Sequence, residues 1–462
     1  MLGEWIRRLD ALVWGWPMIG LLMGTHVYMT VRTGGIQRQV LRGIRLSVTR
    51  DGAAQGDVSQ FGALVTSLCS TIGTGNILGV GTAIALGGPG AVLWMWLTGI
   101  FGMATKYAET LLAVRYRVRT GSGSMLGGAM YVLERGLHMR RMGIAFGVLG
   151  AVCAFGTGCT VQAGAAASGL RALVPLPLPA AGLILCALTG LCILRGIRSI
   201  ARVAEKLVPA MAAFYVAGCA AILIRNHGYL GQTAALILGR ALDFRAAGGG
   251  IAGSAAAAAC RFGVARGLFS NESGMGSAPL AAASAKTANP KRQALVSMTG
   301  TFWDTGVICL MTALALVSEM LRNPSLCALP GTALAAGVFS ALPGGDRMLS
   351  AALSVFAFTT ILGWYYYGER CAVYLLGERC ILGYKCLWIA GVFAGALAET
   401  ELIWSLAELL NGLMAVPNLL GVLLLGGEVA RETRRFRGDR LEQQDDRSVP
   451  RVESLRGALG KE

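Results

Sequence analysis

The sequence predicts an all-helical, polytopic membrane protein with about eleven transmembrane helices, and three observations support this fold class. Hydrophobic residues make up 54% of the 462 residues and charged residues only 14%, with a mean hydropathy of +0.58, far from the averages of soluble domains. Apolar stretches alternate with basic loops along the chain. Two of these stretches, about 200 residues apart, are interrupted near the middle by glycines and small polar residues.

Eleven apolar ranges define the predicted helices. In chain order they are residues 11–31, 59–84, 88–114, 143–169, 178–194, 204–224, 250–286, 294–320, 348–376, 384–399 and 402–426. The first range follows Arg7 and Arg8 and resembles a signal peptide, but no small-residue cleavage site comes after it, so we expect a retained helix. Many of the 65 glycines lie inside these ranges, which suits close helix packing in lipid.

Lysine and arginine residues lie mainly in alternate loops. With the helices placed as above, one set of loops and the C-terminal tail carry 30 of them, and the opposite loops carry eight. Because cytoplasmic loops hold the excess, we expect a multi-pass protein of the cell membrane with its N-terminus outside and its C-terminus in the cytoplasm. Topology therefore explains the net charge of +16, and we expect contact with membrane lipid and no nucleic-acid partner. From Arg434 onward we expect a charged, largely disordered tail.

The first interruption, Ser70–Asn76, lies in the second predicted helix, and the other, Phe269–Ser277, lies in the seventh. A helix that crosses a bilayer must satisfy its own backbone groups, so such breaks are expected only where the backbone lines a cavity. Paired breaks in two halves of a chain indicate the central site of an ion-coupled solute transporter. Five helices, the second to the sixth, are followed by five more, and an odd number inverts the second repeat. We therefore predict a five-plus-five inverted repeat preceded by one extra helix.

This arrangement predicts four parts of the chain. Residues 1–58 form the extra helix and a basic cytoplasmic loop, residues 59–248 the first repeat, residues 249–430 the second repeat, and residues 431–462 the charged cytoplasmic tail.

Six sequence blocks carry a resemblance to a known family. They are residues 73–77 (GTGNI), 83–90 (AIALGGPG), 101–109 (FGMATKYAE), 267–279 (GLFSNESGMGSAP), 358–369 (FTTILGWYYYGE) and 411–418 (NGLMAVPN). In these blocks the chain resembles the sodium:alanine symporter family, also called alanine or glycine:cation symporters. The resemblance implies a leucine-transporter-like fold. It also implies sodium-coupled import of small neutral amino acids such as alanine or glycine by alternating access, with Na⁺ as the coupling ion, no organic cofactor and no enzyme activity.

A zwitterionic amino acid fits the chemistry of two broken helices. Its carboxylate needs donors and its ammonium needs acceptors, and a break offers free N–H groups at one half-helix and free carbonyls at the other. We expect the carboxylate at the amides of the first break and the ammonium at the carbonyls of the second. The residues expected at the substrate are Thr71, Gly73, Thr74, Gly75, Asn76, Gln162, Phe269, Ser270, Asn271 and Gly274. Side-chain oxygens of Thr71 and Asn76 could instead serve a further ion, and the sequence does not separate the two roles.

Gln162 is a neutral polar residue in an apolar helix, where it needs a hydrogen-bond partner. The resemblance implies that it faces the substrate, and the alternative is a hydrogen bond to a neighbouring helix. The family usually has an asparagine two positions later, where this chain has Gly164. That departure bears on substrate preference.

Thr359 and Thr360 place two hydroxyls next to each other in an apolar helix. With the carbonyl of Phe356 one turn earlier, they form an i, i+3, i+4 set that can face carbonyls near Cys69 and Ile72 in the first break. This pattern resembles the sodium site of transporters with this fold. The alternative is that both threonines bond only to their own helix.

Acidic residues inside the predicted helices have open roles. Glu272 and the neighbouring Asn271 are ambiguous, and Glu272 either balances a cation or pairs with an arginine of its own helix such as Arg266. Asp304 is a functional candidate because acids are rare in lipid. A proton carried by Glu272 or Asp304 gives the alternative function, a proton-coupled transporter of a small amino acid or related zwitterion.

Two further features are interpreted as parts of the scaffold. Glu109 is expected to pair with Lys106, three residues earlier on the same helix. The aromatic run Trp364–Tyr367 lies late in its helix, where an interfacial belt is expected and a role in the inner gate is the alternative.

Other classes of protein fit the sequence less well. The three histidines are far apart, no HExxH or GxSxG motif is present, and the twelve cysteines lack the spacing of metal ligands, which argues against an enzyme. Residues 73–79 do not have the spacing of a dinucleotide fingerprint. A channel would repeat a pore element around an axis, whereas this chain has one pair of breaks.

Overall fold

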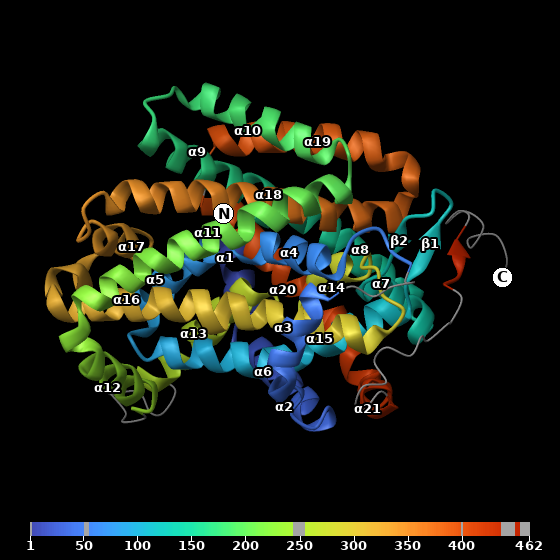
Figure 1. The fold of residues 1–462 in the computed structure, drawn as a ribbon, viewed down its shortest axis with the longest axis horizontal. Coiled ribbons are helices and arrows are strands. Elements are labelled where there is room, and N and C mark those ends of the chain that lie inside the picture. The colour runs from blue at the N-terminus through green and yellow to red at the C-terminus, as the bar shows by residue number, and fades with distance from the viewer. Residues whose placement is uncertain (1, 50–54, 244–254, 399–400, 436–448, 453–462) are drawn as a thin grey trace.

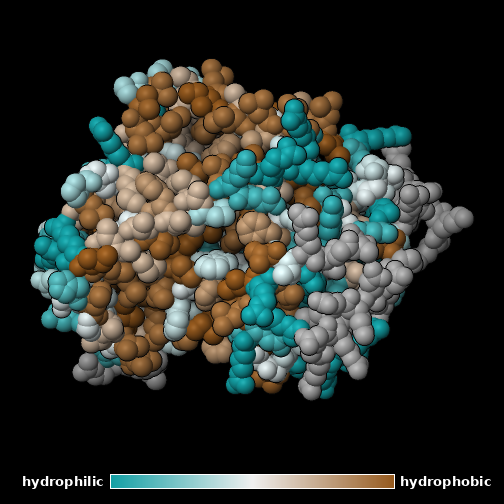
Figure 2. Space-filling view, in the orientation of Figure 1, coloured by the Kyte–Doolittle hydropathy of each residue, from teal (hydrophilic) through white to brown (hydrophobic). Residues whose placement is uncertain are grey.

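Long helices run roughly parallel or antiparallel to one another, from left to right in Figure 1. The computed structural model describes residues 2–49, 55–243, 255–398, 401–435 and 449–452. Among these residues, six helical runs are long and apolar enough to cross a membrane: Arg140–Leu173, Ile197–Arg225, Pro290–Arg322, Gly345–Leu376, Glu378–Leu397 and Ile403–Leu424. In Figure 2 hydrophobic side chains cover much of the surface over the helices, and hydrophilic residues gather at the left end and across the right half. The chain is a multi-pass membrane protein.

The helices before the second break are α1 (Leu2–Val13), α2 (Trp16–Arg32), α3 (Val40–Val48), α4 (Gln60–Thr71), α5 (Leu78–Gly87), α6 (Ala91–Arg115), α7 (Ala129–Tyr131), α8 (Arg140–Cys153), α9 (Val161–Leu173), α10 (Leu178–Ile193), α11 (Ile197–Arg225) and α12 (Leu230–Ala241). From that break onward they are α13 (Ala255–Asn271), α14 (Ala278–Ala282), α15 (Pro290–Thr301), α16 (Leu310–Arg322), α17 (Gly331–Phe339), α18 (Gly345–Leu376), α19 (Ile381–Leu397), α20 (Glu401–Leu424) and α21 (Gly426–Arg435). π-Helical segments join α8 to α9 at Ala154–Thr160 and α15 to α16 at Phe302–Cys309.

Helix is present in each of the eleven predicted ranges, and both predicted breaks are observed. The first range is wrong at its start, because the chain turns before Trp16 and Pro17 opens a new helix there. Helices α3, α7, α12, α17 and α21 and most of α1 were not predicted, since each is short or polar for a membrane span. Residues 250–254 of the seventh range lie outside the described residues. The expected disordered tail also lies mostly outside them, and its first two residues belong to α21.

A small sheet follows α6 at the right end of Figure 1. Strands β1 (Val118–Thr120) and β2 (Met125–Leu126) form an antiparallel hairpin with Val118 opposite Leu126. Strand β3 (Arg451–Val452) adds to β1 in parallel. The sequence analysis did not predict this sheet, because strands of two or three residues have no readable periodicity.

Helix α18 packs on α4, α8, α9 and α11, and it carries Thr359 and Thr360. It lies close against α4 at Gly363, where a Cβ would lie 2.7 Å from the backbone nitrogen of Ser70. One turn later, the hydroxyl of Ser70 donates a 2.6 Å hydrogen bond to Tyr367. Because only glycine permits this approach, Thr360, one turn before Gly363, reaches the first break.

The aromatic run Trp364–Tyr367 is buried, with each side chain at most 1% exposed. Trp364 packs edge-on against Tyr367 at 5.6 Å, and Tyr365 packs against Trp388 of α19 at 5.7 Å between ring centroids. The expected interfacial belt is therefore wrong. These rings fill the space between α18 and its neighbouring helices instead of facing lipid headgroups.

Candidate substrate and ion site

The first break lies between α4 and α5. The backbone is extended at Ile72 (ψ 95°) and Gly73 (φ −147°, ψ −148°) before a 3₁₀ turn over Thr74–Asn76. An extended pair carries the chain away from the axis of α4, so the amides of Thr74 and Gly75 cannot reach the carbonyls of its last turn. These amides are donors without helical acceptors. Thr71, the last residue of α4, is buried and its hydroxyl back-bonds to α4 at 3.4 Å.

Asn76 shapes this break from inside the protein. Its Oδ1 accepts a hydrogen bond from the amide of Gly73 at 2.9 Å, and its Nδ2 donates to Oδ1 of Asp304 at 2.6 Å. In a continuous helix the Gly73 amide would donate to the carbonyl of Cys69, four residues earlier. Asn76 therefore leaves the Cys69 carbonyl without its helical donor.

The second break contains three residues with left-handed backbone. Glu272 has φ 54°, Gly274 has φ 95° and Gly276 has φ 77°. Positive φ is uncommon for a residue other than glycine, and such residues concentrate at functional sites. Ser277 holds the Glu272 carboxylate through a 2.6 Å hydrogen bond to Oε2.

The two breaks lie against each other. A Cβ on Gly75 would lie 3.7 Å from Cδ1 of Phe269 and 3.7 Å from Cα of Ser270. Asn271 Oδ1 accepts the amide of Ser273 at 2.9 Å, so that amide does not donate to the carbonyl of Phe269, four residues earlier. A carbonyl without a helical donor thus lies close to the free amides of the first break.

Asp304, in the π-helical segment between α15 and α16, connects both breaks. Its carboxylate accepts hydrogen bonds from Asn76 at 2.6 Å, from the Ser270 hydroxyl at 3.0 Å and from the Thr305 hydroxyl at 2.8 Å. The side chain is fully buried. Asp304 therefore fixes the distance between the two half-helix ends. Nearby, Asn271 Nδ2 donates to the hydroxyl of Thr305 at 3.2 Å.

Gln162 of α9 reaches the first break. Its Nε2 donates to Oγ1 of Thr74 at 3.2 Å and to the carbonyl of Thr157 at 3.3 Å. Its Oε1 is buried and has no hydrogen-bond partner in the described part of the chain. This oxygen points toward Gly73, where a Cβ would lie 3.6 Å from it. A buried acceptor without a partner costs about 1–3 kcal/mol, which a bound donor would remove.

The hydroxyl pair of α18 meets the first break. Oγ1 of Thr360 lies 2.9 Å from the carbonyl oxygen of Phe356 and 3.4 Å from that of Ile72. Oγ1 of Thr359 also lies 2.9 Å from the carbonyl oxygen of Phe356. Two kinds of neutral oxygen, hydroxyl and backbone carbonyl, lie together here from α18 and from the end of α4, and oxygen donors of this kind suit a hard cation. Both hydroxyls back-bond to α18, as the alternative reading expected, and only Thr360 also reaches the break.

Two cavities border the broken helix α4–α5, one at the start of α4 and one at the start of α5. One, of about 600 Å³, is lined by Leu78, Val161, Gly164, Ser168 and Trp404 among others, and so borders the start of α5 and the residue next to Gln162. The other, of about 790 Å³, borders the start of α4 at residues 57–61, with Arg198, Arg202 and Glu205 of α11 and with Lys286. Helix α4 has 12 residues and is therefore about 18 Å long. The breaks thus lie between two separate cavities.

Two ion pairs from the sequence analysis, one expected and one an open alternative, are not formed among the described residues. Glu272 does not pair with Arg266, because Arg266 donates to Oε1 of Glu408 on α20 at 2.5 Å. Glu109 does not pair with Lys106, whose Nζ has no hydrogen-bond partner among the described residues. The expected Glu109–Lys106 pair is therefore wrong, and of the roles left open for Glu272 the pairing with Arg266 is excluded. Sequence spacing gave the local partner, whereas tertiary packing gave Arg266 and Glu109 distant ones.

Asn418 is a residue of this site that the sequence analysis did not assign. Its Nδ2 donates to Oε1 of Glu109 at 2.5 Å and to the carbonyl of Gly274 at 2.8 Å. The same Glu109 oxygen accepts the amide of Gly276 at 3.1 Å. These hydrogen bonds hold Gly274 and Gly276, the two glycines with left-handed backbone in the second break. An amide side chain inside an apolar helix was the signal that could have identified Asn418.

The structure has two abutting broken helices, a hydroxyl pair beside them and an all-helical membrane fold. Together these features define the class of the protein, a secondary transporter with the leucine-transporter-like fold. The solved structure of MhsT in complex with L-phenylalanine has this fold in common, with a TM-score of 0.57 at 12% identity, over 82% of this chain and 99% of that one.

The chain belongs to the sodium:alanine symporter family, whose model matches residues 1–450. It is 45% identical to the sodium/alanine symporter AgcS of Methanococcus maripaludis over 440 residues, which are 93% of this chain and 96% of that protein. It is also 45% identical to an uncharacterized transporter of Haemophilus influenzae over 436 residues, or 93% and 95% of the two chains. The protein is a transporter of a sodium-coupled amino-acid symporter family and not an enzyme.

Proposed function

We propose that this protein couples the inward movement of Na⁺ to the uptake of a small neutral amino acid such as alanine or glycine. One observation carries the proposal: three sets of unpaired polar groups lie near one another around Gly73 and Gly75. They are the donors of the first break without helical acceptors, a carbonyl of the second break without a helical donor, and the unpartnered Gln162 oxygen. An α-amino acid presents the matching groups, a carboxylate and an ammonium about two bonds apart. The name of the relative AgcS, a sodium/alanine symporter, supports the same substrate class.

In the proposed complex, the substrate carboxylate accepts from the amides of Thr74 and Gly75. The ammonium donates to the carbonyl of Phe269 and to Oε1 of Gln162, which removes the cost of that buried acceptor. Gly73 packs against Thr360, where a Cβ would lie 2.6 Å from Oγ1, so a larger residue would displace that hydroxyl. The remaining proposed contacts form the wall of the site: Thr71, Asn76, Ser270, Asn271 and Gly274.

Na⁺ is proposed to bind between the carbonyls of Cys69, Ile72 and Phe356 and the hydroxyls of Thr359 and Thr360. Support comes from the 3.4 Å approach of Thr360 to Ile72 and from the diversion of the Gly73 amide, which frees the Cys69 carbonyl. Because the ion and the substrate bind the same break, each stabilises the local structure that the other needs. This shared element is the physical basis of coupling.

The orientation and the division into repeats are part of the proposal. The 30 to 8 distribution of basic residues supports an outer N-terminus and a cytoplasmic C-terminus. With that orientation the cavity at Leu78 opens outward and the cavity at Arg198 opens to the cytoplasm. The proposed repeats are residues 59–248 and 249–430, preceded by residues 1–58 and followed by the tail at 431–462.

Uptake of labelled alanine into proteoliposomes containing the purified protein tests the function. An inward Na⁺ gradient is compared with equimolar K⁺ and with a pH gradient, and unlabelled amino acids of increasing size are used as competitors. The proposal predicts uptake with Na⁺ only, and competition by glycine and serine but not by large side chains. Uptake driven by the pH gradient alone would replace Na⁺ by H⁺ as the coupling ion. No alanine uptake under any gradient would contradict the substrate.

A further inference from the structure

The segments next to the inner ends of both broken helices are joined to each other. The amide of Asp57, just before α4, donates to the carbonyl of Ser284, just after α14, at 2.8 Å. The amide of Lys286 donates to the carbonyl of Val58 at 2.8 Å, and Val58 and Ala285 form a parallel β-bridge. These bonds connect residues 55–58 with residues 283–287, at the end of the molecule that carries the basic loops.

Arg117 binds both of these segments through backbone carbonyls. Its Nη1 donates to the carbonyls of Ala283 at 3.2 Å and Ala285 at 2.9 Å, and its Nη2 donates to those of Thr287 at 2.6 Å and Gln55 at 3.4 Å. The residue is only 5% exposed. Burial lowers the pKa of its guanidinium to about 10, so it stays charged at neutral pH. A planar guanidinium can hold several acceptors at once, which a lysine ammonium cannot do in the same geometry.

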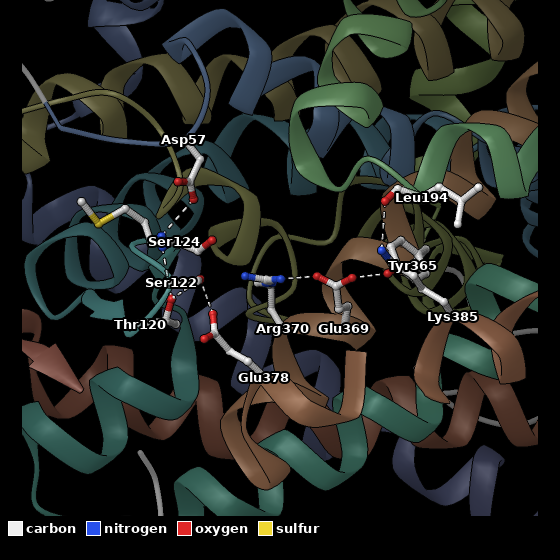
Figure 3. A network of polar contacts seen from close by, with 11 residues as sticks. Asp57, Thr120, Ser122, Ser124, Leu194, Tyr365, Glu369, Arg370, Glu378 and Lys385 are labelled. Atoms are coloured by element: carbon white, nitrogen blue, oxygen red, sulfur yellow. Dashed lines mark hydrogen bonds and ion pairs between the residues drawn. The ribbon is translucent and has the colours of Figure 1, made fainter. Parts of the chain in front are cut away.

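Arg117 sits at the base of the β1–β2 hairpin, and the hairpin is itself fixed on two sides. In Figure 3, Asp57 accepts the amide of Met125 at 2.9 Å, and Glu378, after α18, accepts from the hydroxyl of Ser122 at 2.5 Å. The guanidinium of Arg119 also contacts the side chain of Gln55. The hairpin thus holds the guanidinium of Arg117 in place between the two segments.

Burial raises the pKa of Asp57, and the cationic groups that oppose this effect are Arg370, Arg198 and Arg117. Arg370 lies on α18 beside Glu369, which also contacts the hydroxyl of Tyr365 (Figure 3). The acid and these arginines belong to the same polar layer at this end of the bundle.

We propose that Arg117 is the gate residue of the cytoplasmic side, a guanidinium latch that must release the backbone of residues 55–58 and 283–287 before the inner half-helices α4 and α14 can separate. The proposal rests on the proposed function for the direction of transport, but the latch itself is a property of the chain without ligand. Among the described residues, Arg117 is the side chain that bonds to both segments through four backbone carbonyls. Arg117 acts on the backbone and does not touch the proposed substrate.

Hydrogen exchange measured by mass spectrometry on the full-length protein in lipid nanodiscs tests this latch. The peptides that cover residues 55–60 and 283–289 contain the amides of Asp57, Val58 and Lys286, which the closed latch protects. In Arg117→Ala we expect their exchange to be roughly tenfold faster or more, because bonds to a charged group stabilise the closed state. Arg117→Lys should give an intermediate effect, and it serves if the alanine variant does not fold.

Arg135→Ala is the matched control, since Arg135 is exposed on the segment after α7 and its removal changes the net charge equally. It should leave both peptides unchanged. Unchanged exchange in the two Arg117 variants would overturn the latch, as would acceleration spread evenly over all helices, which reports global destabilisation. If the wild type transports no alanine while Arg117 variants still release these peptides, the proposed function fails and the latch stands.

Discussion

Replacing Thr360 by valine tests the proposed sodium site with a change that keeps the size of the side chain. Oγ1 of Thr360 lies 3.4 Å from the carbonyl oxygen of Ile72 and 2.9 Å from that of Phe356, and the side chain is 2% exposed. Valine puts a methyl group where the hydroxyl was, so the ion loses one ligand while the packing of α18 is kept. An interaction with a charged group is worth about 1.5–3 kcal/mol, which corresponds to roughly a 10- to 150-fold loss of apparent Na⁺ affinity.

The assay is the Na⁺ dependence of alanine uptake in proteoliposomes. The account predicts a higher half-saturating Na⁺ concentration in Thr360→Val, with uptake partly restored at saturating Na⁺. Thr66→Val is the control, because Thr66 of α4 is fully buried and its hydroxyl donates only within its helix, to the carbonyl of Gly62 at 2.7 Å. An unchanged half-saturating concentration in Thr360→Val, or an equal rise in Thr66→Val, would refute the assignment.

Three further changes test other parts of the site. Gln162→Leu removes the proposed acceptor for the ammonium and should raise the KM for alanine roughly tenfold or more, whereas an unchanged KM would leave Gln162 as a structural residue. Gly363→Ala places a Cβ 2.7 Å from the backbone of Ser70, and the overpacking should cost about 1–3 kcal/mol, measured as a lower unfolding temperature together with weaker Na⁺ dependence; an unchanged unfolding temperature would show that α18 can move away without cost. Burial raises the pKa of Asp57 above its ordinary value of 3.8, so the folded protein binds this proton more tightly than the unfolded chain does, and stability should fall as pH rises from about 4 through the raised pKa. Asp57→Asn should remove that slope from the unfolding temperature, and parallel slopes in the two proteins would contradict the effect.

The sequence predicted the elements whose signal lies along the chain. Both breaks and the helices around them were readable because lipid forbids unsatisfied backbone, so Ser70–Asn76 and Phe269–Ser277 stood out in apolar stretches. Thr359 and Thr360 were readable because two adjacent hydroxyls are unusual in such a helix. The approach of Thr360 to Ile72 required only that α18 pack on α4.

Contacts between distant segments could not be predicted in the same way. Asn76 was expected at an ion or the substrate, which stays a prediction. The structure adds that its amide group bonds to Gly73 and Asp304, and the second contact joins residues 228 positions apart in the sequence. Arg266 of α13 pairs with Glu408 on α20 and not with Glu272, which lies just after α13, because helix packing brings the Glu408 carboxylate closer. The Arg117 latch is invisible in the sequence, since all its acceptors are backbone carbonyls and carry no residue signature.

The burial of Trp364–Tyr367 is another case in which contacts between distant segments could not be predicted from the sequence. Aromatic residues near a helix end are typical of a membrane interface, and the sequence alone gives no reason to place them elsewhere. The structure places them against α8, α9 and α19, where Gly158 leaves room for the Trp364 side chain. The pattern was read correctly as aromatic and late in the helix, but the neighbouring helices decided what those rings contact.

Alanine binding to the purified protein, measured with and without Na⁺, tests most directly the claim that one broken helix holds both ion and substrate. Equilibrium binding of labelled alanine is titrated at several Na⁺ concentrations with K⁺ as the replacement, and Na⁺ binding is then titrated with and without alanine. The account predicts that Na⁺ tightens alanine binding and that alanine tightens Na⁺ binding by the same factor, because linkage is reciprocal. Alanine affinity that is independent of Na⁺ would contradict the account.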